Sequence, residues 1–519
     1  MIGIACTASD LNRCDLGLTT LAAAVRRGVA AAGGLPVAFP VMSLSEDLMK
    51  PTAMLYRNLL AIEVEETIRS QPLDGVVALG NCDKTVPAYL MALASADIPA
   101  LIVTGGFRPV ASFRGERLGS GTALWRMYDE RRAGRVSDAD WAGLETCLGA
   151  GLGACNTMGT ASTMAIMAEA LGLTLPGTAV FEAGDPRQEA LAEVAGQRVV
   201  DLVASGTRPS SRLTPAGFER AMTVLAAIGG STNAIIHLCA VAGRRGITLP
   251  LERFGQIAAR VPVIADIAPI GTGLMDDLAR AGGVPAVLAA LDGGSAQPPR
   301  WPLRPVSDPV TTAPAFMVVR GNLAPDGAVL KAAAASPGLL RHSGPAVVFH
   351  SYGEMRQRID DPDLEVTRDS VLVLAGCGPV GAAMPEWGNI PIPAKLLREG
   401  VTDMLRISDA RMSGTGYGTV VLHVAPESAV GGPLSLLRDG DMVSFDAFAG
   451  ELSVEPGVLA GREPVLPGAA GAAGVADKRG WPLLHRMHVT QAPQGCDYDF
   501  LQARAPEQLP FVEPVIGRS

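Results

Sequence analysis

A strand, a loop, a helix and a second strand over residues 74–106 constrain the fold more than any other feature. The run DGVVAL (74–79) is short and apolar, as buried strands are, and Pro87 suits the first turn of the helix that YLMALA continues. The run PALIVTGG (99–106) predicts the next strand. Such a βαβ unit belongs to an open α/β sheet, where ligands bind at the carboxyl ends of the strands. The loop GNCDKTVP (80–87) lies there, so we expect it to carry chemistry.

Length and composition predict two domains. A chain of 519 residues with 48% hydrophobic and only 4% aromatic residues exceeds one ordinary domain and supplies an extensive core. The Gly- and Pro-rich stretch 291–309 is the best linker candidate. Helices expected at 18–32 and 51–70 precede it, and short β-rich runs such as FMVVRG and DSVLVLAG follow it. We therefore expect an α/β domain over residues 1–300 and a β-barrel-like domain over residues 301–519.

Charge and hydropathy exclude several classes of protein. A net charge of -9 without a long basic run argues against nucleic-acid binding, whereas a small anionic substrate stays compatible with local cations. The uncharged stretches 147–168 and 223–243 are long enough to cross a bilayer, but their Gly, Ser, Thr and Asn residues indicate a buried loop and helix, so no membrane span is expected. The start MIGIACTASD lacks the features of a signal peptide, which predicts a cytoplasmic protein.

Three of the eight cysteines lie beside polar or glycine-rich loops: Cys14 in SDLNRCD, Cys82 in GNCDK and Cys155 in GLGACNTMGTASTM. Thiolates bind iron, and an iron–sulfur cluster can leave one iron without a protein ligand, free to act as a Lewis acid. Widely spaced single cysteines are more commonly buried, inert thiols, and this alternative stays open. The scattered cysteines of a long, unsecreted chain favour metal or redox roles over disulfides. We expect the other five to be core or incidental residues: Cys6, Cys147, Cys239, Cys377 and Cys496.

Carboxylates and one serine recur beside similar loops. Carboxylate oxygens are the ligands that magnesium prefers. Taken singly, each such acid is more commonly a solvated surface group or a helix cap, and a serine in a Gly-rich turn is usually a turn residue. The candidates are Glu46 in SLSED, Asp83 after Cys82, Glu386 in AAMPEWGN and Ser413 in RISDARMSGTGYGT.

The segment GCGPVG (376–381) matches the G-x-G-x-x-G fingerprint after the strand-like run SVLVLA. However, Pro379, Gly381 and Pro385 oppose the helix that would hold a pyrophosphate. We therefore expect no dinucleotide site.

Together these segments resemble one known family. GNCDKTVP, GGSTNAIIHL (229–238), GNLAPDGAV (321–329) and DARMSGT appear in a single order, and the match runs from about residue 2 to the CDYDFL segment (496–501). The chain thus resembles the dihydroxyacid and sugar-acid dehydratases. The resemblance implies an amino-terminal α/β domain, a carboxyl-terminal β-barrel domain, a homodimer or homotetramer, an iron–sulfur cluster and a magnesium ion.

The resemblance also implies roles for individual residues. On the α/β domain it implies cluster ligands, most of the magnesium ligands and a lysine carbamylated on its amine, whereas Glu386 and the proposed base belong to the barrel-like domain. The cluster ligands are Cys14, Cys82 and Cys155; the magnesium ligands are Glu46, Asp83 and Glu386; the lysine is Lys84; and the base is Ser413, with Thr415 close by. The first cysteine follows Arg13, where the family commonly has proline, and the family normally has a further segment before the first strand.

The expected activity is that of a hydro-lyase that turns a 2,3-dihydroxy acid into a 2-keto-3-deoxy acid. Magnesium would stabilise the enediolate while the open iron takes the departing hydroxyl. The segment SLSEDLMKPTAMLYRN (43–58) resembles the sugar-acid members, which favours an aldonate substrate such as arabinonate or xylonate and a 2Fe-2S cluster, with 4Fe-4S still open. The alternative is the dihydroxyacid dehydratase of branched-chain amino-acid biosynthesis. An iron–sulfur electron carrier or sensor would need the cysteines but not the acids, so the acids favour an enzyme.

Overall fold

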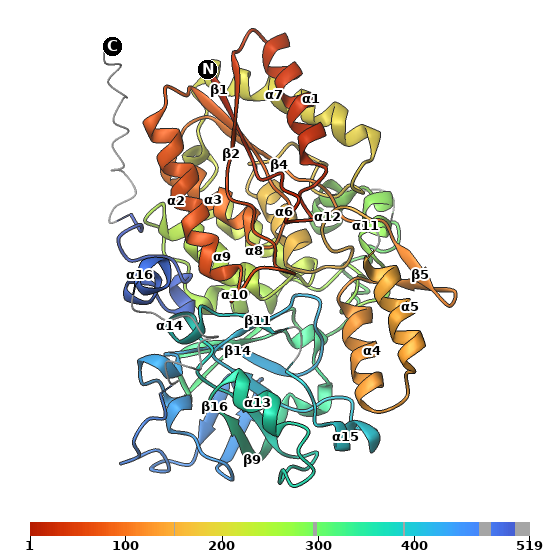
Figure 1. Cartoon of the computed structure of the whole chain (residues 1–519), viewed down its shortest axis with the longest axis vertical. Coiled ribbons are helices and arrows are strands. Elements are labelled where there is room, and N and C mark those ends of the chain that lie inside the picture. The colour runs from red at the N-terminus through yellow and green to blue at the C-terminus, as the bar shows by residue number, and fades with distance from the viewer. Residues whose placement is uncertain (150, 294–297, 388–389, 467–478, 504–519) are drawn as a thin grey trace.

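The computed structural model describes residues 1–519 except 150, 294–297, 388–389, 467–478 and 504–519 (Figure 1). The chain builds an upper body, drawn red to green, in which helices surround a sheet, and a lower body, drawn cyan to blue, that contains a barrel. The expected fold class, an α/β part followed by a β-barrel-like part, is confirmed. Within the described ranges, no helix is both long and apolar enough to cross a membrane.

The α/β part is organised around a four-stranded parallel sheet. Its strands are short apolar runs, such as GVVAL, whose side chains are buried on both faces. Ile4 and Val77 belong to the apolar cluster on one face, whereas Ala5 and Val76 belong to the cluster on the other. Because all the strands run the same way, their carboxyl ends share one edge. In spatial order the strands are β2 (Pro36–Pro40), β1 (Ile2–Cys6), β3 (Gly75–Leu79) and β4 (Ala100–Val103).

Helices cover both faces of this sheet. On one face α1 (Leu18–Ala31) packs against α7 (Pro186–Ser205), and a glycine allows a close approach. A Cβ atom on Gly28 would lie 1.9 Å from the carbonyl oxygen of Glu193, so no larger residue fits at this crossing. The helices that contribute to the cluster on the opposite face include α2 (Met54–Ser70), α3 (Thr85–Ala96), α6 (Thr160–Ala170), α8 (Pro215–Ala227) and α9 (Asn233–Gly243).

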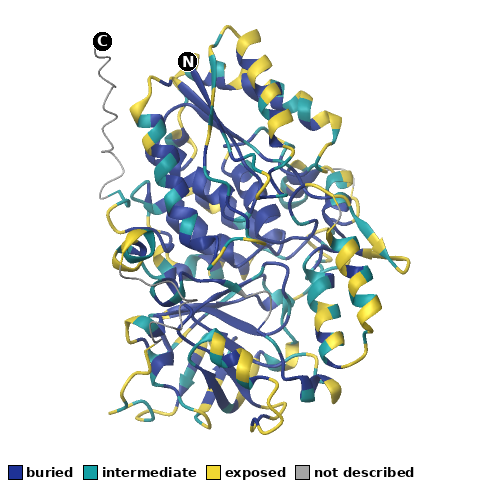
Figure 2. Cartoon of the chain, viewed as in Figure 1, coloured by how far each residue is buried: buried dark blue, intermediate teal, exposed yellow. Residues whose placement is uncertain are grey.

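Burial separates the inner helices from the outer ones (Figure 2). Every residue of α3 is buried, and its sequence TVPAYLMALASA carries no charge, as expected of a helix that is apolar on all sides. The helices α4 (Thr122–Arg132) and α5 (Asp138–Gly149) form an arm at the side of the molecule together with the hairpin of β5 (Ala111–Phe113) and β6 (Glu116–Leu118) (Figure 1). The remaining helices here are α10 (Leu251–Ala258), α11 (Met275–Ala281) and α12 (Gly283–Asp292).

The expected linker, residues 291–309, begins at the end of α12, and its residues 294–297 lie outside the described part of the chain. The domain boundary at residue 300 stays a prediction.

The second part is a closed eight-stranded barrel. Small and branched apolar side chains fill its interior, among them Val319, Val348, Val373 and Val421. Around the barrel the strands are β10 (Val371–Leu374), β12 (Arg406–Ser408), β14 (Val420–Ala425), β8 (Ala324–Leu330), β7 (Met317–Gly321), β16 (Glu451–Val454), β15 (Met442–Asp446) and β9 (Arg341–Phe349). The short helices outside it are α13 (Tyr352–Arg358), α14 (Pro379–Ala382) and α15 (Ala394–Arg398).

After the barrel, the chain returns to the α/β part. The helix α16 (Gly480–His488) and the residues that follow it lie beside α2 (Figure 1). Arg57 of α2 is fully buried and donates from Nη2 to the carbonyl oxygen of Cys496 at 2.8 Å. Arg244, also fully buried, donates from Nε to Oδ2 of Asp497 at 2.5 Å. The C-terminal segment thus supplies the partners of two buried cations in the other body.

Candidate active site

The four parallel strands deliver side chains from their carboxyl ends to one cavity of about 150 Å³. Cys14 follows β1, Glu46 follows β2, Asp83 follows β3 and Arg108 follows β4. This is the edge at which an open parallel sheet places its ligands. The βαβ unit expected from the sequence thus predicted the edge of the sheet at which these side chains converge.

The barrel part reaches the same cavity through a separate two-stranded ribbon. In this ribbon β11 (Glu386–Trp387) pairs in parallel with β13 (Arg411–Met412), and Glu386 lies directly opposite Arg411. Ser413 and Thr415 follow β13, and both line the cavity with Glu386. Two halves of the chain that are far apart in sequence thus share one site.

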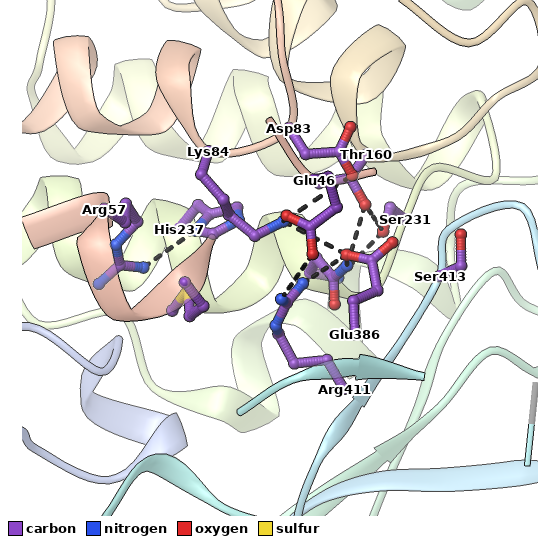
Figure 3. Close-up of polar contacts among 12 residues, drawn as sticks. Glu46, Arg57, Asp83, Lys84, Thr160, Ser231, His237, Glu386, Arg411 and Ser413 are labelled. Carbon is purple, nitrogen blue, oxygen red and sulfur yellow. Dashed lines mark hydrogen bonds and ion pairs between the residues drawn. The ribbon is translucent and has the colours of Figure 1, made fainter. Parts of the chain in front are cut away.

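Three carboxylates that line this cavity lie close to one another and to one buried amine (Figure 3). One carboxylate oxygen each of Glu46, Asp83 and Glu386 lies within 4.8 Å of the others. The fully buried Lys84 places Nζ 3.4 Å from Glu46 Oε2, 3.8 Å from Asp83 Oδ2 and 3.3 Å from Glu386 Oε2. Arg411 adds a second buried cation, which pairs with Glu386 and with Glu46 Oε1 at 3.2 Å.

The charges in this cluster are not fully balanced. Burial raises the pKa of Asp83 to about 7 although Lys84 opposes the rise, and the neighbouring Glu386 adds to it. Burial would also raise the pKa of Glu46, but Lys84 and Arg411 outweigh it and lower that pKa. Oε2 of Glu46 is buried and, within the described residues, accepts no hydrogen bond, although it faces Lys84. Three converging carboxylate oxygens, one of them unsatisfied, fit a hard divalent cation such as Mg²⁺.

The three predicted cysteines line the same cavity as the carboxylates. The thiols of Cys14 and Cys82 contact each other through a hydrogen bond, which together with burial raises the pKa of Cys82 well above its usual range. Burial raises the pKa of Cys155 to about 12. Thiols of this kind stay protonated at neutral pH unless a metal takes the place of the proton. A set of three sulfur atoms around one cavity fits an iron–sulfur cluster.

Ser413 is held by a short chain of hydrogen bonds from the arm. Its Oγ lies 2.8 Å from Oγ1 of Thr415, which accepts a hydrogen bond from Nε1 of Trp125 at 3.1 Å. The hydroxyl of Thr122 donates to the carbonyl oxygen of Thr415 at 2.8 Å. A Cβ atom on Gly414 would lie 2.7 Å from Ser231, so the turn that presents Ser413 requires glycine. The serine is therefore positioned by packing and not only by its own turn.

The structure brings all the predicted site residues together. Those that line the cavity are Cys14, Glu46, Cys82, Asp83, Cys155, Glu386, Ser413 and Thr415, and Lys84 is buried behind the carboxylates. Their roles as ligands and as a base stay predictions.

Sequence reasoning missed three polar residues of the site. Asn233 donates from Nδ2 to Glu386 Oε2 at 3.1 Å, Arg411 pairs with the acids, and Arg108 lines the cavity. Asn233 and Arg411 lie within the motifs GGSTNAIIHL and DARMSGT, which gave no hint of these contacts. Arg108 follows the predicted strand 99–106, so the rule that selected the loop after residues 74–79 would also have found it.

The GCGPVG loop is filled by the protein's own acids. Asp409 accepts hydrogen bonds from the backbone N–H groups of Gly376 and Cys377, at 3.0 and 2.9 Å. Glu427 accepts hydrogen bonds from the backbone N–H groups of Val380 and Gly381, at 2.7 and 2.8 Å. The N–H groups that could cradle a phosphate are therefore already occupied.

Comparison with known proteins places this chain in a family. Residues 1–296 match the dihydroxy-acid/6-phosphogluconate dehydratase N-terminal family, and residues 302–496 match the corresponding C-terminal family. The chain is 46% identical to the L-arabonate dehydratase of Azospirillum brasilense, over 98% of its own length and 92% of the relative's. It is also 46% identical to the 6-deoxy-6-sulfo-D-gluconate dehydratase of Pseudomonas putida (97% and 90% covered). Identity to the dihydroxy-acid dehydratase of Oceanobacillus iheyensis is 34% (88% and 85% covered). The chain therefore belongs to the dihydroxy-acid/6-phosphogluconate dehydratase family, and it is a hydro-lyase.

Proposed function

We propose that this hydro-lyase dehydrates a sugar acid, an aldonate, to the corresponding 2-keto-3-deoxy acid. The observation that supports the proposal is the single cavity whose lining joins three carboxylates, three cysteines and the Ser413–Thr415 pair. The relatives at 46% identity are named for sugar acids, which supports this substrate class over a branched-chain dihydroxy acid.

The carboxylates Glu46, Asp83 and Glu386 would hold Mg²⁺, and Cys14, Cys82 and Cys155 would hold a 2Fe-2S cluster, with 4Fe-4S as the alternative. When bound, the two groups supply positive charge near the enediolate that forms at C1 and C2 and a Lewis acid for the hydroxyl that leaves C3. Arg411 orients Glu386 and Glu46 through its guanidinium, which keeps both acids directed into the cavity.

Lys84 would serve as a carbamate. As an ammonium group it lies within 3.3–3.8 Å of all three acids and would repel a divalent cation at the same place. Addition of carbon dioxide to Nζ replaces the positive charge by a negative one and offers oxygen to the metal. Protein prepared in ¹³C-bicarbonate should show a carbamate signal in its ¹³C spectrum that Lys84→Arg lacks, and identical spectra would remove this role from the lysine.

Ser413 would act as the base. Its Oγ, as the alkoxide, takes the proton from C2, the C3 hydroxyl leaves as water after gaining a proton, and the resulting enol converts to the 2-keto acid. Serine is a weak base in water, so nearby positive charge must favour its alkoxide. The hydroxyl of Thr415, held by Trp125, fixes the direction of Ser413 Oγ.

Side-by-side kinetics on anaerobically prepared enzyme test the substrate class. We expect kcat/KM to be higher for arabinonate, xylonate or gluconate than for 2,3-dihydroxyisovalerate, because a site that hydrogen-bonds hydroxyls discriminates against analogues that lack them. A clear preference for dihydroxyisovalerate would make the branched-chain enzyme the correct alternative. Turnover of neither class, with an intact cluster, would favour an iron–sulfur carrier or sensor.

We also expect the protein to assemble as a homodimer or homotetramer.

A further inference from the structure

Arg108 is a buried cation beside the predicted cluster ligands. It follows β4, is only 3% exposed and lines the same cavity as Cys14, Cys82 and Cys155. Burial would lower its pKa, but Cys155, Cys14, Asp47 and Cys82, in that order, outweigh that effect and raise it. The guanidinium and the three sulfur atoms therefore share one cavity, where its positive charge would favour deprotonated sulfur.

Most of the hydrogen bonds of Arg108 fix the loop that precedes Cys155. Its backbone N–H donates to the carbonyl oxygen of Ala154 at 2.8 Å, and its Nε donates to the same oxygen at 3.3 Å. Its Nη1 donates to the carbonyl oxygen of Leu148 at 3.3 Å. The bridge between Phe107 and Ala154 extends the attachment along the backbone. Arg108 thus ties the Cys155 loop to the end of the sheet.

One nitrogen of the guanidinium is left over. Nη2 is buried and has no hydrogen-bond partner among the described residues. A buried, charged N–H group without an acceptor is costly, and a guanidinium fork normally meets an anion. A cluster on three thiolates is negatively charged and would lie in the cavity that Arg108 lines.

We propose that Arg108 is a positioning residue of the cluster, which holds Cys155 in place through Nε and Nη1 and offers Nη2 as counter-charge to the sulfur ligands. The inference rests on the cluster of the proposed function. The counter-charge favours the more negative, reduced form of the cluster and so raises its reduction potential. It also makes thiolates at this buried place less costly.

The test compares anaerobically reconstituted holoenzyme with Arg108→Met, which keeps bulk but removes the charge, and Arg108→Lys, which keeps the charge but not the fork. Arg13→Met is the matched control, because Arg13 lines the same cavity but is 37% exposed and pairs with Asp47 at 3.0 Å. The measurements are the midpoint potential from a spectroscopic redox titration, iron per protein, and the half-life of the visible absorbance in chelator.

At the wild-type midpoint we expect at least a tenfold lower ratio of reduced to oxidised cluster in Arg108→Met, which equals a shift of 59 mV for one electron. Arg108→Lys should recover most of the potential but not the half-life, since lysine lacks the separate nitrogens with which the guanidinium bonds Ala154 and Leu148. Arg13→Met should change the ratio less than twofold.

Three results would overturn the inference. The first is a wild-type potential and half-life in Arg108→Met. The second is cluster loss in both Arg108 variants at unchanged melting temperature, which would exclude the role of charge. The third is a raised KM for the sugar acid with an unaltered cluster, which would make Arg108 a substrate-binding residue. A wild-type protein without any cluster would instead refute the proposed cofactor, and this inference with it.

Discussion

The two bodies contribute to the cavity in different ways. The α/β part uses the carboxyl ends of four parallel strands, so its contributions follow from the topology of one sheet. The barrel contributes from a ribbon of two short strands, β11 and β13, that lies outside its closed sheet. The topology of the sheet therefore explains the position of Asp83. Glu386 and Ser413 are instead positioned by the separate ribbon of β11 and β13. In the proposed mechanism the sheet holds the cofactors and the ribbon completes the metal site and supplies the base.

The largest expected effect tests whether the sheet side holds the cluster. Cys155→Ser should lose the cluster iron, the visible absorbance and all measurable dehydration, because a serine oxygen is a poor substitute for a thiolate ligand. Iron analysis and electron paramagnetic resonance would measure the loss. Cys147→Ser is the control, since Cys147 lies in α5 and packs with an apolar cluster there. Full iron and an unchanged spectrum in Cys155→Ser would leave only two cysteines as ligands.

The second-largest expected effect tests whether the ribbon side supplies the base. Ser413→Ala should lower kcat by about 10²- to 10⁴-fold, the usual contribution of a general base, while cluster content and substrate binding stay near wild type. Steady-state kinetics and calorimetric binding would separate the two. Thr415→Val, which removes only the partner of Ser413, should have a smaller effect. A loss in Ser413→Ala below about tenfold would assign the proton transfer to another group.

A third prediction asks whether both bodies bind the same ion. Glu46→Gln on the sheet side and Glu386→Gln on the ribbon side should each weaken Mg²⁺ binding by at least about 10- to 100-fold, the range found even for residues that only support a ligand. Titration of chelator-treated protein with Mg²⁺ measures both affinities. Normal binding in Glu386→Gln would confine the metal ligands to the sheet side.

The smallest effect concerns pH. The pKa of Asp83 is about 7 in the folded state and 3.8 is its ordinary value, so between these values the unfolded chain releases a proton that the folded protein keeps. In metal-free protein the contribution of Asp83 to stability therefore falls as pH rises from about 4 to about 7. Asp83→Asn cannot ionise, and it should melt about 1–3 °C above wild type at pH 8 but not at pH 4. Differential scanning fluorimetry in chelator checks this, and an equal difference at both pH values would contradict it.

Much of the sheet side could be predicted from sequence because its information is local. The runs IGIAC, GVVAL and ALIV are strands as expected, and the loop after each one contains site residues. The apolar runs FMVVRG, DSVLVLAG and DMVSFDAF likewise predicted barrel strands. In both parts the apolar pattern predicts a strand correctly where the side chains of one short segment alone determine whether that segment is buried.

On the ribbon side, local sequence offered Glu386 and Ser413 only as candidates, and the resemblance was needed to assign them to one site. Arg411 is fully buried, although a charged residue in a short segment normally indicates that the segment lies at the protein surface. Its burial depends on Glu46 and Glu386, and Glu46 lies in the other body. Arg57 and Arg244 are similar, because some of their acceptors come from residues 495–497. No local pattern contains a partner that is hundreds of residues away.

The returning C-terminal segment sets an order of events during synthesis. Arg57 leaves the ribosome 439 residues before Cys496, its hydrogen-bond acceptor. At about 5–20 residues per second, this interval lasts roughly 20–90 s. During that time Arg57 and Arg244, which are fully buried in the finished protein, have their partners within the α/β part but lack the acceptors that residues 495–497 supply. The first body to be made is therefore among the last to be completed, because two of its buried cations gain their remaining acceptors only when residues 495–497 emerge.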